Sequence, residues 1–167
     1  MRSQHILLIL PLLFLIVESQ SSKCPRYWFD ASYWKLGCLS FNATQKMTWH
    51  EAQDFCMSMN SHLIEIFIQE QQDFIVMKSL EIQDLLGKQI MHWWTGLTKI
   101  GSEEGIWYWA HSLQIADYFA WGVEEPNQIP VQSDYVNLDS FLDYGWSDCP
   151  IDGDLYLTYP ICQFFPN

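Results

Sequence analysis

The order of the sequence patterns predicts an α+β fold. Two segments with helical spacing of apolar residues come early in the chain, at about 48–60 and 70–86. Short aromatic strands separated by glycine-containing turns follow from about residue 93 to the end. Because the helices precede most strands and do not alternate with them, the pattern favours α+β architecture over a parallel βαβ sheet.

The first predicted helix has a clear start. Residues 27–41 are expected to form a short hairpin before it, and Thr48 then has the character of an N-cap, with Glu51 as its capping-box partner. Asn60-Ser61 is the expected end. The apolar face of this helix consists of Trp49, Ala52, Phe55 and Cys56.

The second predicted helix runs from Glu70 to about Leu86, and Gly87 is its expected stop. Its apolar stripe is predicted to be Phe74, Met77 and Leu80. Residues 63–68, between the two helices, suit either a strand or a connector. From Trp93 onward the apolar period changes to two, which is typical of strands.

A long segment of irregular pattern, about 110–144, follows the first aromatic strands. It contains Pro126 and Pro130 together with many polar residues. A long loop within a compact domain usually carries function. Here it carries Glu125-Pro126-Asn127, and Asp148 follows about twenty residues later.

The N-terminus predicts a secreted protein. Residues 1–19 combine a basic start, an apolar run of about a dozen residues and a small-residue cleavage region, so they are expected to be a signal peptide. The run is short for a membrane span, which takes about 20 residues. Residues 20–167 are then expected to form one domain.

Composition narrows the class of partner. A formal net charge of −12 and a pI near 4.5 argue against nucleic acids and anionic membranes, which select clustered Lys and Arg. The aromatic content of 16% favours a packed globule over disorder. The sequence has no His-Glu-x-x-His, Cys-x-x-Cys or Gly-x-Ser-x-Gly motif, so we expect a binding protein and no enzyme.

Five cysteines in a secreted chain predict two disulfides and one cysteine left over. Fifteen connectivities satisfy that count, and the residues alone do not choose among them. Asn42-Ala43-Thr44 is an acceptable sequon in a polar bend, so we predict N-glycosylation at Asn42.

The motifs taken together resemble the C-type lectin-like domain over essentially the whole mature chain. The resemblance implies two helices packed on small antiparallel sheets, a long ligand-binding loop, and the disulfides Cys24–Cys38 and Cys56–Cys162. Its supporting segments are Thr48 to Cys56, His62-Leu63-Ile64, Trp94-Thr95-Gly96-Leu97, Gly105 to Trp109, Glu125-Pro126-Asn127, Trp146-Ser147-Asp148-Cys149 and Ile161-Cys162.

The resemblance also implies a calcium site with mannose-type preference. Glu125, Asn127 and Asp148 are the expected metal ligands, since carboxylate and amide oxygens suit a hard cation. A cis Glu125-Pro126 bond would direct both neighbouring side chains to the same side. The order of acid and amide then selects the stereochemistry of a sugar hydroxyl pair, because the acid accepts and the amide donates hydrogen bonds.

Two departures from the family pattern predict weak calcium binding. Ser147 stands where the family has an asparagine, and Ser133 stands where sugar-binding members have a glutamate. Asp134 is a candidate substitute for the latter. We expect Ser133, Asp134 and Ser147 to add at most weak metal or sugar contacts. An auxiliary calcium site is not expected, because Lys99 and Gln128 are poor ligands.

Cys149 lacks its family partner, which would fall at Asp134 or Tyr135. We therefore expect a free thiol or an intermolecular bridge, and the bridge would give a disulfide-linked homodimer. The leading functional hypothesis is a secreted, calcium-dependent lectin for mannose-type glycans in pattern recognition or innate defence. The alternative is a related protein that has lost sugar binding and binds a protein through the long-loop face.

Overall fold

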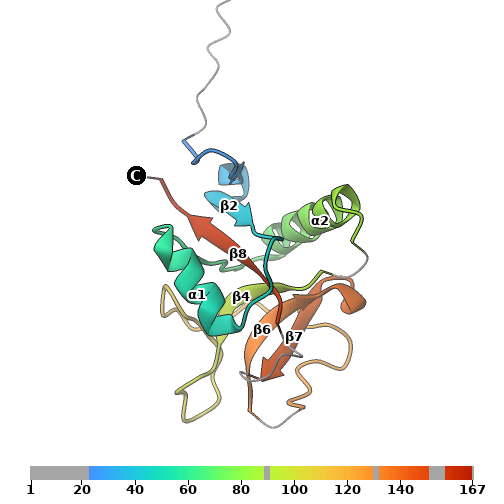
Figure 1. Cartoon of the computed structure of the whole chain (residues 1–167). Coiled ribbons are helices and arrows are strands. Elements are labelled where there is room, and N and C mark those ends of the chain that lie inside the picture. Colours follow the sequence, from blue (N-terminus) through green and yellow to red (C-terminus); the bar gives the residue numbers. More distant parts are fainter. Residues whose placement is uncertain (1–22, 89–90, 130–131, 151–156, 167) are drawn as a thin grey trace, which may run out of the picture.

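The computed structural model describes residues 23–88, 91–129, 132–150 and 157–166. The predicted signal peptide therefore lies outside the described residues. The elements confirm the α+β class, with two helices and mostly short strands (Figure 1). In chain order they are β1 (Phe29–Asp30), β2 (Cys38–Phe41), α1 (Trp49–Ser58), β3 (His62–Leu63), α2 (Gln69–Leu85), β4 (Trp93–Thr98), β5 (Tyr108–Trp109), β6 (Ser133–Asp139), β7 (Gly145–Pro150) and β8 (Tyr159–Phe164), with short 3-10 turns η1 (Ser32–Trp34) and η2 (Ser140–Leu142).

The strands form one continuous path in the order β1-β2-β8-β4-β6-β7, with β3 added at β8 and β5 added at β4. All the pairs are antiparallel except β4 with β8, which is parallel. The sheet is thus mostly antiparallel, as expected, with one parallel junction between β4 and β8. Figure 1 shows β8 running between the β2 end and the β4-β6-β7 end of the molecule. This central strand joins the two halves of the sheet.

Helix α1 begins with the predicted capping box. The Thr48 hydroxyl accepts from the Glu51 backbone N–H at 3.3 Å, and the Glu51 carboxylate accepts from the Thr48 N–H at 2.9 Å. The backbone and hydroxyl hydrogen bonds from Thr48 lower the pKa of Glu51. Trp49, Ala52 and Cys56 are buried as predicted.

Helix α2 presents a different face to the core from the one predicted. Phe74 is buried, but Met77 and Leu80 are about half exposed, at 49% and 51%. Two glutamines occupy the inner face in their place. Gln71 and Gln72 are both buried, and Gln72 accepts from the Trp146 indole N–H at 2.9 Å while donating to the Tyr144 carbonyl at 2.8 Å. Because the side-chain amides of both glutamines are hydrogen-bonded, their burial costs little free energy. The prediction chose the wrong face of α2 because it placed polar residues at the surface.

Two disulfides tie the fold together. Cys24 pairs with Cys38 and Cys56 pairs with Cys162, which are the pairs that the family resemblance implies. The second bridge spans 106 residues and fastens α1 to β8. On a chain-entropy estimate, a loop of that length contributes about 4 to 5 kcal/mol.

The long loop after β5 is fixed at its end by β7. Trp146 is fully buried, and its backbone N–H donates to the Ala120 carbonyl at 2.8 Å. The Gly122 N–H donates to the Trp146 carbonyl at 2.9 Å. These two bonds hold the loop directly ahead of Glu125 against the same strand that carries Asp148.

Candidate functional site

Glu125 and Asn127 lie together in the long loop. The Glu125-Pro126 peptide bond is cis. The Asn127 side-chain amide donates to a Glu125 carboxylate oxygen at 2.7 Å, so the two side chains meet on one side of the proline. The Asn127 amide oxygen in turn accepts from the Ile129 backbone N–H at 2.7 Å.

Asp148 reaches the same loop from strand β7. The residue is 3% exposed, and its carboxylate accepts from the Asn127 N–H at 2.9 Å and from the Gln128 N–H at 3.0 Å. The Asp148 N–H donates to Glu125 Oε2 at 3.3 Å. The structure thus brings together Glu125, Asn127 and Asp148, although 21 residues separate the last two in sequence.

The two carboxylates influence each other. Burial raises the pKa of Glu125, and the neighbouring Asp148 side chain raises it further, whereas backbone N–H donors from Asp148 and Asn127 act in the opposite direction. A pair of acids in a partly desolvated site is stabilised by a proton or by a cation between them. Their oxygens, with the Asn127 amide oxygen, form a hard donor set suited to Ca²⁺.

Asp134 lies beside the side chains of Lys99 and Thr98. Its carboxylate lies 3.9 Å from the Lys99 ammonium, and its backbone carbonyl accepts from the Thr98 hydroxyl at 2.8 Å. No group of three His, Cys, Asp or Glu that could hold a metal ion occurs among the described residues. The expectation that Asp134 substitutes for the acid missing at Ser133 stays a prediction, and in this structure its carboxylate lies beside Lys99.

The two serines lie on the strands beneath the loop. Ser133 is fully buried and opposite Pro150, and Ser147 is half-buried and opposite Asn137 in the β6-β7 register. Their predicted weak metal or sugar contacts stay a prediction.

Cys149 is a free thiol within the protein interior. It is 3% exposed, and burial raises its pKa to about 12. Tyr135 lies directly opposite it in the β6-β7 register, at one of the two positions expected for the missing cysteine. The free-thiol prediction agrees with the structure, but burial argues against a disulfide-linked homodimer through this sulfur.

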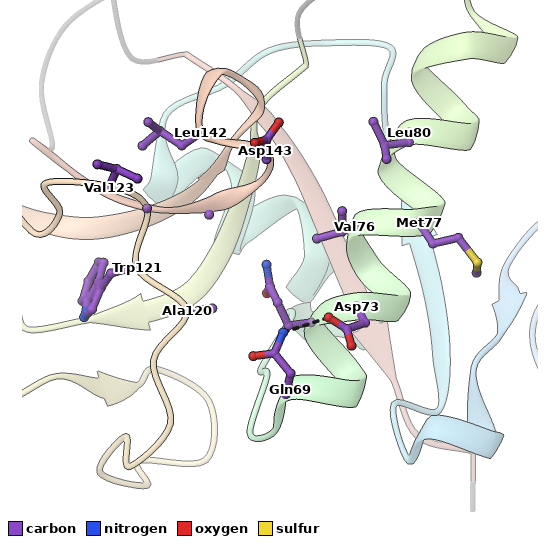
Figure 2. Close-up of a pocket in the computed structure, with 13 residues that line it drawn as sticks. Gln69, Asp73, Val76, Met77, Leu80, Ala120, Trp121, Val123, Leu142 and Asp143 are labelled. Carbon is purple, nitrogen blue, oxygen red and sulfur yellow. Dashed lines mark hydrogen bonds between the residues drawn. The ribbon is translucent and has the colours of Figure 1, made fainter.

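A second, larger cavity lies away from these residues. It has a volume of about 770 Å³ and is formed between α2 and the loop before Glu125, as Figure 2 shows. Val76, Met77 and Leu80 contribute from the helix, and its polar side chains include Gln69 and Asp73, which hydrogen bond to each other at 2.8 Å. A smaller polar cavity of about 300 Å³ adjoins Asn127 and Asp148. Its wall contains His92, Asn137 and Asp139, for which the sequence offers no motif.

Residues 45–164 match the family described as the Lectin C-type domain. The chain belongs to the C-type lectin domain family. C-type lectins are carbohydrate-binding proteins and not enzymes, so the expectation that this chain is not an enzyme is confirmed by its family. The family generally binds Ca²⁺.

Known members resemble this lectin domain over different shares of their length. A perlucin-like protein of Mytilus galloprovincialis is 26% identical over 155 residues, covering 87% of this chain and 91% of that protein. Human C-type lectin domain family 4 member K is 31% identical over 108 residues, covering 63% of this chain but 30% of its own length. The structure of the C-type lectin CEL-I from Cucumaria echinata has a TM-score of 0.72 at 19% identity, with 86% of this chain and 99% of that one covered.

Proposed function

We propose that this C-type lectin domain is a secreted protein that binds mannose-type glycans with the help of Ca²⁺. The observation that carries the proposal is the convergence of Glu125, Asn127 and Asp148 from two separate segments. A turn that only needed capping would not require a buried carboxylate from a distant strand. A cation site explains why two acids are held this close together.

Calcium is the metal that these residues fit. Glu125 and Asp148 supply carboxylate oxygens, and Asn127 supplies an amide oxygen, all of which are hard ligands. When bound, the ion offers coordination positions to sugar hydroxyls. Because Ser147 and Ser133 replace an amide and an acid of the family pattern, we expect affinity within or below the range of extracellular modules, about 10⁻⁴ to 10⁻³ M.

Mannose-type preference follows from the order of the two side chains. The Glu125 carboxylate accepts a hydrogen bond and the Asn127 amide donates one. A pair of adjacent sugar hydroxyls is therefore bound in one orientation. Mannose-type sugars place two adjacent equatorial hydroxyls in the orientation that this acid-before-amide order is expected to favour.

Secretion is supported by the expected signal peptide and by the two disulfides, which persist in oxidising compartments. Among the described residues no helix is both long and apolar enough to cross a membrane. A single shallow site binds one sugar weakly, so recognition of a glycan-covered surface would depend on several sites acting together. This behaviour suits pattern recognition or innate defence.

The test measures calcium and sugar binding together. We expect Ca²⁺ to raise the melting temperature, and a mannose column to retain the protein in Ca²⁺ and release it in EDTA. Asp148→Asn should abolish both effects, because it removes a buried carboxylate of the site. If calorimetry detects no calcium at millimolar concentration, and the column never retains the protein, the lectin proposal fails and the protein-binding alternative replaces it.

A further inference from the structure

The polar cavity of about 300 Å³ shares a wall with the proposed calcium site. Asn127 and Asp148 line it on that side, so the cavity adjoins two of the three expected metal ligands. The remaining wall comes from β6, β7 and the segments that precede β4 and β8. That wall includes His92, Asn137 and Asp139, together with Phe141 of the 3-10 turn η2.

Asn137 gives this cavity an unused hydrogen-bond acceptor. The residue is 7% exposed, and its side-chain oxygen has no hydrogen-bond partner in the described part of the chain. Its direct partner across the β6-β7 ladder is Ser147, which lines the same cavity. Directly opposed residues of two paired strands share a face, so Asn137 and Ser147 face the cavity together. A buried carbonyl oxygen requires a donor, and a ligand hydroxyl or a water molecule supplies one.

The rim of the cavity carries a fixed aromatic ring. Phe141 is 70% exposed, and its ring centroid lies 5.4 Å from that of His92. Asp139 positions both residues, because its carboxylate accepts from the Phe141 N–H at 2.7 Å and lies 3.1 Å from His92 Nδ1. Through these two contacts, Asp139 holds the apolar face of the Phe141 ring beside the hydrogen-bonding groups that line the cavity.

This combination matches the chemistry of a sugar ring, which has C–H faces and hydroxyl edges. The cavity volume is about ten times the roughly 30 Å³ occupied by one water molecule in the liquid, and it lies at the lower end of small-molecule sites. It is far larger than a single ion requires. The cavity therefore suits one hexose unit better than a second cation.

We propose that this cavity binds a second hexose, linked to the one held at Glu125 and Asn127. Asn137 accepts a hydroxyl hydrogen bond from the second ring, and Phe141 packs against its C–H face. This inference rests on the proposed lectin function and adds to it a preference for disaccharides over monosaccharides. Recognition then depends on glycosidic linkage as well as on the terminal sugar.

The experiment compares methyl α-mannoside with an α-linked mannobiose by calorimetry in saturating Ca²⁺. We expect the disaccharide to bind roughly two- to tenfold more tightly, which is the range that corresponds to one net hydrogen bond. Asn137→Leu removes the amide at similar volume, and Phe141→Ala removes the exposed ring. Each variant should reduce the disaccharide advantage, while the calcium Kd reports whether the loop is still folded.

Phe165→Ala is the matched control, because this phenylalanine is also exposed, at 53%, but packs near His62. It should keep the full disaccharide advantage. Equal affinity of the wild-type protein for both sugars would overturn the second subsite and leave the lectin function intact. An advantage that survives both Asn137→Leu and Phe141→Ala would also overturn it. Absence of binding to Ca²⁺ and to either sugar would overturn the proposed function and this inference with it.

Discussion

Ser147 is the residue at which a single substitution should most improve the proposed site. It occupies a family asparagine position in β7, one residue before Asp148. Ser147→Asn adds an amide oxygen for the ion and an N–H donor for a sugar hydroxyl, so calcium and mannose affinities should rise together. We expect a gain of about threefold or more in both, in line with one added hydrogen bond or ligand contact.

Calcium titration by calorimetry and mannose-column retention measure this effect. Ser58→Asn serves as the control, because Ser58 is an exposed residue at the end of α1. It should change neither quantity. A Ser147→Asn protein with unchanged calcium affinity would contradict the assignment of position 147 to the site.

Reversing the acid and amide should change the sugar preference. Glu125→Gln combined with Asn127→Asp keeps one acid and one amide but exchanges their positions around the proline. We expect preference to shift from mannose toward galactose, because the donor and acceptor directions are exchanged. Competitive elution with the two sugars measures the shift. Unaltered mannose preference would show that sugar selection lies outside these two residues.

The Cys149 thiol should be unreactive in the native protein. Its pKa is raised to about 12 by burial, so almost none of it is thiolate at pH 8, and its sulfur is shielded from reagents. Thiol labelling without reductant should therefore be negligible until denaturant is added, and should then reach one equivalent. Cys149→Ser should give no labelling in either condition. A covalent dimer on a non-reducing gel would contradict this prediction.

At the scale of elements, Gln72 couples α2 to the strand that carries Asp148. Gln72→Leu would leave the Trp146 indole N–H and the Tyr144 carbonyl without their partner in the interior. We expect the free energy of unfolding to fall by about 1 to 3 kcal/mol. Chemical denaturation measures this change. Gln69→Leu removes only exposed hydrogen bonds, to Asp73 and Tyr118, so it should cost less, and an equal loss in both variants would contradict the coupling.

Elements with local signals were predictable, whereas those decided by tertiary contacts were not. The capping box of α1 needs only Thr48 and Glu51, and the sequence predicted it correctly. The buried face of α2 depends on distant partners of Gln71 and Gln72, so the prediction for Met77 and Leu80 was wrong. The candidate site divides in the same way. Glu125 and Asn127 flank a single proline in the sequence, but Asn137 is brought to the cavity by strand register, which no motif encodes.

At the scale of the whole molecule, the Asn42 sequon should be glycosylated when a eukaryotic secretory pathway makes the protein. Asn42 lies between β2 and α1 and is partly exposed, and its side-chain oxygen accepts from the Thr44 N–H at 3.0 Å. Glycosidase treatment of secreted protein should increase gel mobility, and Thr44→Ala should abolish the difference. Unchanged mobility of the wild-type protein after treatment would refute the prediction.

Strand β8 follows every other strand in the sequence, yet it lies between β2 and β4 in the sheet and holds one cysteine of the longer disulfide. A growing chain therefore cannot close the sheet until this strand has left the ribosome, even though α1 and α2 were made long before. Both halves of the sheet must remain open during synthesis, with their apolar faces unprotected. The join between the two halves of the sheet and the longer disulfide therefore form only after nearly all of the domain has been made.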